Sequence, residues 1–323
     1  MRVLGKPRLD LITAIVAEAQ FPGITAGLLE KDEHLTDALE AIFGLQFQHA
    51  TLVFCGGTSL SKGHALIERM SEDADLKLIL SEETSTWSKN ELRRYLGDEV
   101  RDKIDGALGA LGFEQDMRES RNGNRYFHTQ WAYQRAYEYG EASALRPNLQ
   151  IELTARAPLL PIEVLRLGSL ADRLANRDGK SFEVATVAVA ETEAEKVLSF
   201  LRRYAQNQAG KMIRPWDTAL VRHIYDVHCI HMQQPELIDQ AVPVFAELVA
   251  GDQAELGQQH PEFLEDPIAV LEKALQSIGG DVSTREEYER NLLPLVYGNF
   301  KPGFEESFAS FRSLATAMLA SIR

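Results

Sequence analysis

The sequence predicts an α/β domain of the α+β kind with a mixed sheet, followed by an all-α helical domain. Strand-like and helix-like segments alternate up to residue 190, and only helical patterns follow. A chain of 323 residues is long enough to bury the cores of two domains of ordinary size. We therefore expect a first domain at residues 1–190 and a helical domain at residues 191–323.

The first elements are predicted by apolar spacing. Apolar residues three and four apart indicate helices, and the short apolar run before Gly56 indicates a strand that ends in a glycine turn. In order, these elements are helices at residues 9–19 and 34–45, a strand at 51–54, a helix at 58–67, and a strand that begins at Asp73 and ends at residue 80.

The middle of the chain combines capping and turn signals. Ser88 is followed three residues later by Glu91, and this capping box predicts a helix at residues 91–111. An Asn-Gly-Asn turn signal at residues 122–124 lies between strand-like runs. Strands are predicted at residues 125–133, 148–153 and 183–190, whereas residues 165–176 fit either a helix or a strand.

The second domain shows helical patterns alone. Thr192 is predicted to cap its first helix, with Glu195 three residues later as the other half of a capping box. The helices predicted here lie at residues 194–207, 218–232, 236–250, 267–277 and 305–321.

Candidate chemistry is concentrated around the glycine turn and the strand after it. Glycines let a backbone approach a ligand closely, and a helix that opens beside them presents free N–H groups to an anion. The residues predicted to cradle phosphates are Gly56, Gly57, Thr58, Ser59 and Lys62. Asp73 and Asp75 are two apart on a strand and point to one face, where a cation would offset their repulsion. This pattern suits magnesium ions bridged to nucleotide phosphates.

These motifs resemble those of the nucleotidyltransferase superfamily. The run Gly-Gly-Thr-Ser-Leu-Ser-Lys at 56–62, with Arg-Met-Ser-Glu-Asp-Ala-Asp-Leu at 69–76, is similar to the AbiEii/AbiGii toxin family, which includes the MenT toxins. The run is not a Walker A loop, because the lysine follows a serine and precedes a glycine. The resemblance implies a nucleotidyltransferase fold, Mg²⁺ or Mn²⁺ as cofactor, and a nucleoside triphosphate (NTP) as substrate.

The resemblance also implies further site residues. In the superfamily a third acid on a neighbouring strand completes the metal site, and Glu152 lies at the matching place. Lys196 resembles the family's third motif, a lysine on a helix after a strand, which implies a contact with the triphosphate. Asp226 matches the second acid of the fourth motif, whereas His223 replaces the first. Whether Asp226 or His223 is the general base stays open, as does a role of Asp226 in orienting Lys196.

The function that the resemblance implies is that of a toxin. Such an enzyme, in a toxin–antitoxin pair or in phage defence, transfers a nucleoside monophosphate from an NTP to an RNA acceptor, in the MenT branch the 3′ end of tRNA. A cognate antitoxin is then an expected partner. Two alternatives stay open, since the same residues serve an enzyme that modifies a protein or a small molecule, and the departure at His223 leaves room for a non-catalytic NTP-binding module.

The net charge of −14 argues at first against a nucleic-acid partner, but its distribution is uneven. Residues 233–290 hold thirteen acidic and three basic residues, which account for −10 of this charge. Residues 200–222 hold five basic residues and one acidic residue, a local charge of +4. A basic patch near the site and solvated helix faces both fit this pattern.

Cysteine usage and hydropathy indicate a cytoplasmic protein without a membrane segment. Cys55 and Cys229 are too few for a disulfide framework, and each lies in an apolar run that predicts a buried thiol. No apolar run approaches the roughly 20 residues of a membrane span. Acidic residues interrupt the amphipathic N-terminal stretch, so we do not expect a signal peptide.

Overall fold

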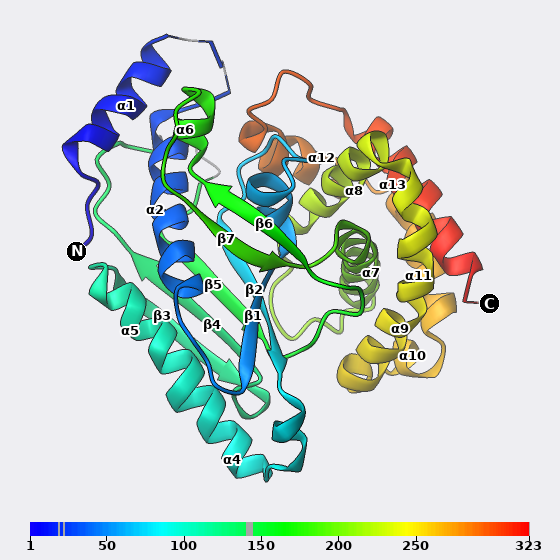
Figure 1. The fold of residues 1–323 in the computed structure, drawn as a ribbon. Helices are drawn as coiled ribbons and strands as arrows, with labels where there is room; N and C mark the ends of the chain where they lie inside the picture. Colours follow the sequence, from blue (N-terminus) through cyan, green and yellow to red (C-terminus); the bar gives the residue numbers. More distant parts are fainter. Residues whose placement is uncertain (19, 22, 140–144, 323) are drawn as a thin grey trace. The chain divides into compact units, whose positions relative to one another are not determined.

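The computed structural model describes residues 1–18, 20–21, 23–139 and 145–322 (Figure 1). The chain forms two compact units, Met1–Val187 with Tyr297–Asn299, and Ala188–Val296 with Phe300–Arg323. The predicted fold class, a mixed sheet with helices followed by a helical region, is confirmed. The assignment of catalysis to residues 1–190 and of a separate helical domain to residues 191–323 stays a proposal.

The first unit is built on a mixed sheet. Among the described residues, seven strands are hydrogen-bonded in the order β3-β4-β5-β2-β1-β7-β6. The central pairs β2–β5 and β1–β7 are parallel, and the other pairs are antiparallel. The strands are β1 Ala50–Cys55, β2 Asp73–Leu80, β3 Glu114–Arg121, β4 Tyr126–Ala132, β5 Leu149–Thr154, β6 Glu163–Gly168 and β7 Ser181–Thr186.

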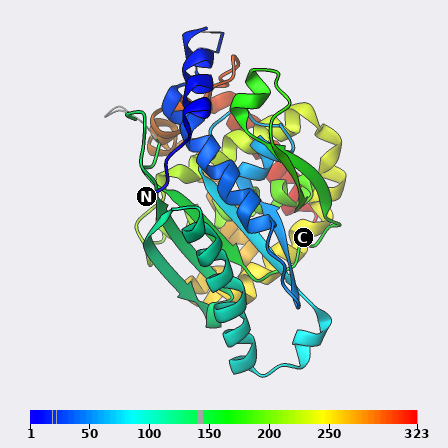
Figure 2. The same cartoon turned by 60° about the vertical axis from the view of Figure 1, so that its left-hand side comes forward.

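In the first unit, helices α2 Ala26–Phe43 and α5 Asp102–Ala110 cover one face of this sheet (Figure 2). Leu39 of α2 and Ile104 of α5 share an apolar core with Leu76 of β2 and Ile151 of β5. The capping box of Ser88 and Glu91 is confirmed, with both of its hydrogen bonds formed. The helices of this unit are α1 Lys6–Ala17, α2 Ala26–Phe43, α3 Gly56–Thr58, α4 Lys89–Arg94, α5 Asp102–Ala110 and α6 Leu170–Leu174.

Helix α2 begins at Ala26, well before the helix predicted at residues 34–45. The prediction missed its first half because that half buries charged side chains instead of apolar ones. Four consecutive charged side chains in it are buried: Glu30, Lys31, Asp32 and Glu33. Each contacts a different segment: Glu30 accepts from the backbone of Ala136, Lys31 pairs with Glu72, Asp32 pairs with Lys62, and Glu33 pairs with Arg8. Apolar periodicity cannot reveal a helix whose buried face is ionic.

The observed helix begins earlier than the one predicted at residues 58–67 and is shorter. It consists of α3 and a π-helical turn, Ser59–Gly63, so it opens at Gly56. It ends at Gly63, since Ala65 has φ 54° and so leaves the helical region. Further along, the carbonyl of Glu68 accepts hydrogen bonds from the N–H groups of Tyr297 and Gly298, at 2.9 and 3.2 Å. This contact joins Tyr297–Asn299 to the first unit.

Two further predictions need correction near the end of the first unit. Residues 165–176 contain both a strand end and a helix, since β6 ends at Gly168 and α6 follows. The predicted strand at 183–190 ends at Thr186, and α7 Val189–Gln208 begins at once, with Ala188 as its N-cap. The capping box predicted for Thr192 is therefore wrong, because the Thr192 N–H already bonds to the Ala188 carbonyl inside the helix.

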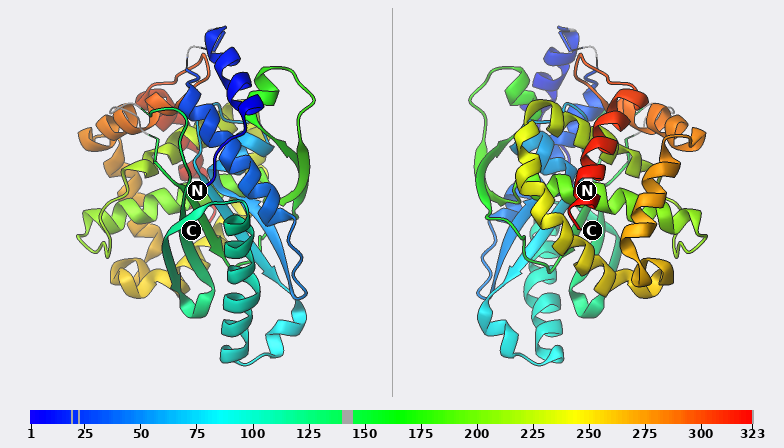
Figure 3. Two further views of the ribbon diagram at one scale, coloured as in Figure 1. Left: turned by 90° about the vertical axis from the view of Figure 1, so that its left-hand side faces the viewer. Right: turned by 90° about the vertical axis from the view of Figure 1, so that its right-hand side faces the viewer.

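The second unit is helical in its described residues (Figure 3). Its longest helix, α7, packs against α8, α9, α11 and α13. Phe200 and Leu201 of α7 are fully buried. The helices are α7, α8 Arg222–Gln233, α9 Ile238–Leu256, α10 Pro261–Glu265, α11 Pro267–Ile278, α12 Val282–Glu287 and α13 Phe304–Ala320. None of the helices in the described part of the chain has both the length and the apolar composition needed to cross a membrane.

Candidate active site

Three carboxylates share the sheet face opposite the apolar core. Asp73 and Asp75 alternate along β2 with the buried Ala74 and Leu76. Strand β2 runs parallel to β5, and in this register Asp75 lies directly opposite Glu152. The strand pairing thus brings together two acids that are far apart in the sequence.

The pairing of β5 with β4 brings further polar side chains next to Glu152, which sequence analysis did not predict. His128 of β4 lies opposite Glu152, and its Nε2 is 3.2 Å from the Oε1 atom of Gln150. Tyr126 donates its hydroxyl to Glu152, and burial together with this carboxylate raises the pKa of Tyr126. The period of two along the strand predicted at residues 125–133 was the available signal, because it puts Tyr126, His128 and Gln130 on one face, which the burial pattern of β4 shows.

The glycine pair is needed for the turn and for close packing. Gly56 has φ 75°, in the left-handed region that favours glycine, and a Cβ there would lie 2.0 Å from the Oδ2 atom of Asp75. A Cβ at Gly57 would lie 2.7 Å from the Nη2 atom of Arg69. The backbone therefore passes directly beside the acid that faces Glu152.

The side chains predicted to cradle phosphates have internal partners. The hydroxyl of Thr58 donates to the Asp73 carbonyl, and the hydroxyl of Ser59 donates to the Gly56 carbonyl at 2.9 Å. Lys62 Nζ lies 2.6 Å from Asp32 Oδ1, and the Lys62 side chain is buried. These contacts fix the turn and the short helix, and a direct role of these three side chains in nucleotide binding stays a prediction.

Arg146 is a second residue that sequence reasoning missed. Its Nη1 atom lies 3.0 and 2.9 Å from the two carboxylate oxygens of Asp73. Its backbone is held by the buried pair beneath, since Glu72 Oε2 accepts from the Arg146 N–H at 2.6 Å and from Lys31 Nζ at 2.5 Å. Burial lowers the pKa of Lys31, and Glu72 opposes that shift. No local pattern signals a contact across 73 residues.

The donor set fits a magnesium ion that also binds nucleotide phosphates. Within residues 1–18, 20–21, 23–139 and 145–322, no three His, Cys, Asp or Glu side chains are gathered closely enough to hold a metal alone. Magnesium is commonly bound through one or two carboxylates together with substrate phosphates. Asp73 and Asp75 supply such oxygen donors, and Arg146 covers one of them in this structure.

In the second unit, Lys196 and Asp226 form a buried ion pair. Lys196 Nζ of α7 lies 2.7 Å from Asp226 Oδ2 of α8, and their side chains are 7% and 0% exposed. Lys196 is therefore not an exposed surface lysine. The contact agrees with the option that Asp226 orients Lys196, while their predicted roles in catalysis stay predictions.

Glu193 lies one turn before Lys196 on α7 and is a buried acid. Its side chain is 1% exposed, and neither carboxylate oxygen has a hydrogen-bond partner among the described residues. Burial raises its pKa to about 8. At neutral pH this side chain is therefore mostly a neutral carboxylic acid.

Several side chains of the basic segment at residues 200–222 have acidic partners inside the helical unit, and whether the segment contacts RNA stays a prediction. Tyr204 is buried, and Arg202 and Trp216 are at least half-buried. Each of the three contacts an acid: Arg202 with Asp252 at 2.9 Å, Tyr204 with Asp281 at 3.0 Å and Trp216 with Glu287 at 2.9 Å. Part of the local positive charge is therefore paired inside the helical unit, whereas Lys211 and Arg214 are exposed.

A sheet with two acids beside a glycine turn, and a third acid opposite on the next strand, defines a nucleotidyltransferase-type site. The family model "Nucleotidyl transferase AbiEii toxin, Type IV TA system" matches residues 37–310. The chain belongs to this family, and it is a nucleotidyltransferase of the toxin class in type IV toxin–antitoxin systems.

Solved structures with similar folds include two bacterial proteins. MenT4, a nucleotidyltransferase toxin from Mycobacterium tuberculosis H37Rv, is 20% identical, with a TM-score of 0.47 over 99% of this chain and 100% of that chain. JHP933 from Helicobacter pylori is 12% identical, with a TM-score of 0.41 over 93% of this chain and 94% of that chain. A search of curated proteins finds no match.

Proposed function

We propose that the chain transfers a nucleoside monophosphate from an NTP to an RNA acceptor, most simply the 3′ end of tRNA in the cytoplasm. Mg²⁺ or Mn²⁺ would be held by Asp73 and Asp75, with Glu152 completing the site. The observation that carries this proposal is the register of β2 and β5, which sets Asp75 opposite Glu152 and beside the backbone of Gly56. A cognate antitoxin is the partner that the family implies.

In the transfer one bond to phosphorus forms and one breaks. The oxygen of an acceptor hydroxyl forms a bond to the α-phosphorus, the bond from that phosphorus to the bridging oxygen breaks, and pyrophosphate leaves. The hydroxyl proton passes to a basic group and then to water. A bound divalent metal offsets the charge on the entering and leaving oxygens.

Several residues of the first unit position the acidic side chains for this step. The Gly56 backbone leaves room for Asp75, and the hydroxyl of Tyr126 orients Glu152. Arg146 contacts both oxygens of Asp73, so its guanidinium competes with a metal for this carboxylate. Once released, an arginine at this place is suited to bind a phosphate.

The test uses purified protein, Mg²⁺, each of four labelled NTPs, and total RNA, protein and metabolite extracts. We expect label in RNA, mainly in tRNA, and its loss in Asp75→Asn. Asp116→Asn, which changes an exposed aspartate on β3, is the matched control and should keep the activity. Unfolding curves of both variants verify their fold.

The outcomes separate the acceptors. Label in a protein or a metabolite, with none in RNA, would replace the RNA acceptor but keep the nucleotidyltransferase. Label in RNA that persists in Asp75→Asn would remove the proposed metal site. Metal-dependent NTP binding by calorimetry without transfer to any extract would favour the NTP-binding module.

A further inference from the structure

A small cavity in the first unit has more basic than acidic side chains among the twelve residues that line it. Its volume is about 130 Å³. Four basic residues line it, against the single acid Asp32: Lys62, Arg69, Arg166 and Arg173. The residues that line it in the described structure do not include the acids proposed for the metal or the glycine pair. They do include Lys62, one of the residues predicted to cradle phosphates, and Arg69, which lies against Gly57, so the cavity is a candidate anion site next to the glycine turn.

Arg173 carries most of this argument. Its Nη1 atom is 3.3 Å from the Ser61 carbonyl and its Nη2 atom is 3.5 Å from the Tyr297 hydroxyl, so both contacts are long and both acceptors are neutral. In the described part of the chain Arg173 forms no ion pair. A guanidinium has five N–H donors, and most of those of Arg173 remain available to a ligand.

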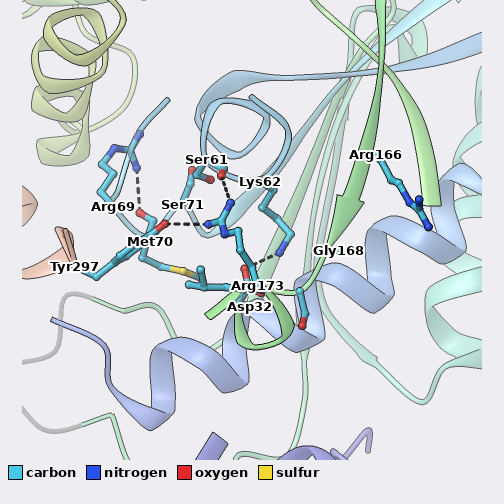
Figure 4. Close-up of a pocket in the computed structure, with 12 residues that line it drawn as sticks. Asp32, Ser61, Lys62, Arg69, Met70, Ser71, Arg166, Gly168, Arg173 and Tyr297 are labelled. Atoms are coloured by element: carbon cyan, nitrogen blue, oxygen red, sulfur yellow. Dashed lines mark hydrogen bonds and ion pairs between the residues drawn. The ribbon is translucent and has the colours of Figure 1, made fainter. Parts of the chain in front are cut away.

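The neighbouring side chains complete a cationic lining (Figure 4). Figure 4 shows Arg173 between Arg69 and the pair of Lys62 with Asp32, whereas Arg166 stands apart. Lys62 is offset by Asp32, while Arg69 is 3% exposed and donates to the Met70 carbonyl at 3.0 Å. The charge of Lys62 is thus offset within the lining, whereas the contacts of Arg173 in the described part of the chain are to neutral acceptors.

Tyr297 supplies a neutral donor on the same side. Burial raises the pKa of Tyr297 to about 12, so its hydroxyl keeps its proton at neutral pH. A protonated phenol beside two guanidinium groups can donate to an oxyanion without adding charge.

The size of the cavity restricts the ligand. Sites for drug-sized ligands usually have volumes of about 300–1,000 Å³, and this cavity of about 130 Å³ holds a single oxyanion with water rather than a nucleoside. Arginine guanidinium groups match phosphate oxygens in geometry and charge. We propose that the cavity binds one phosphate group, either as orthophosphate or as the phosphate of a monoester, through Arg173, Arg69 and Tyr297. Binding needs neither a metal nor group transfer, so it can be tested independently of the proposed function, although Lys62 belongs to both sites.

The test measures binding of orthophosphate by calorimetry and by ³¹P NMR, with EDTA present so that the metal site cannot contribute. Wild-type protein should bind orthophosphate in a saturable way, and Arg173→Gln should weaken binding about tenfold or more, as expected for the loss of a charge-assisted contact. Arg173→Lys, which keeps the charge but loses the planar donors, should fall between the two. Arg94→Gln, at an exposed arginine of α4, is the control and should bind as wild type does.

Adenosine monophosphate distinguishes the two ligand sources. Equal affinity for both probes assigns the site to a phosphate group on any small ligand, and binding of orthophosphate alone assigns it to the free ion. The proposal is overturned if neither probe binds in a saturable way, if Arg173→Gln, with an intact fold by circular dichroism, binds as wild type does, or if Asp75→Asn removes the binding.

Discussion

Substitution of Glu193 by glutamine should make the stability of the protein less dependent on pH. Burial without a hydrogen-bond partner raises the pKa of this carboxyl from 4.5 to about 8. Between these pH values the folded protein keeps a proton that the unfolded chain has released. The stability that this carboxyl contributes is therefore complete below its pKa in the unfolded chain, 4.5. It is lost as the pH rises toward its pKa in the folded protein, about 8.

The magnitude follows from the width of that interval. Each pH unit inside it costs about 1.4 kcal/mol of unfolding free energy, so a change from about pH 6 to about pH 7.5 costs roughly 2 kcal/mol through this one group. Glu193→Gln has no proton to lose and should lack this decline. Its side chain has nearly the same shape, so the comparison concerns ionisation and not packing.

Urea unfolding followed by circular dichroism at the two pH values measures this difference. The quantity to compare is the loss of unfolding free energy between the two pH values in wild type minus the same loss in the variant. The effects of the other titrating groups cancel in this difference. Glu247→Gln, at an exposed position of α9, controls for the loss of one acidic side chain. If Glu193→Gln loses as much stability as wild type between the two pH values, the carboxyl is not buried as a neutral acid and the reasoning is refuted.

Three further substitutions test the site. Gly56→Ala should cost about 1–3 kcal/mol of stability and weaken metal-dependent NTP binding in calorimetry, because φ is 75° and the new Cβ would lie 2.0 Å from Asp75 Oδ2; unchanged binding would contradict this. Lys196→Met should cost about 3–5 kcal/mol in urea unfolding by leaving Asp226 buried without its partner, and the double variant with Asp226→Leu should regain stability but not transferase activity; an active double variant would remove both residues from the reaction. Arg146→Gln should raise Mn²⁺ affinity severalfold in electron paramagnetic resonance titrations, since the cation that covers an aspartate is gone; equal or weaker affinity would show that the guanidinium does not compete with metal.

Local patterns predicted the parts of the site that lie within a few residues of each other. The period of a strand was enough to put Asp73 and Asp75 on one face, and the glycine pair marked the turn beside them. The capping box of Ser88 and Glu91 was likewise readable, because both of its bonds are local.

Long-range contacts were not predictable, because their partners are set by the fold. Lys62 fits a phosphate cradle in the sequence, yet the fold gives it Asp32 of α2 as a partner. Arg146 was hidden for the same reason, since only strand pairing and the buried Glu72 bring it to Asp73. The capping box predicted at Thr192 was wrong because a valine-rich segment does not reveal where a strand ends and a helix begins.

The return of Tyr297–Asn299 to the first unit affects when that unit can be completed during synthesis. The Glu68 carbonyl, which follows the glycine turn, receives its N–H donors from Tyr297 and Gly298. A ribosome that has finished the sheet at Thr186 must still add more than a hundred residues before these donors emerge. At about 5–20 residues per second this takes roughly 5 to 20 seconds. We therefore expect the first unit to be completed only after residues 188–296 of the second unit have been synthesised.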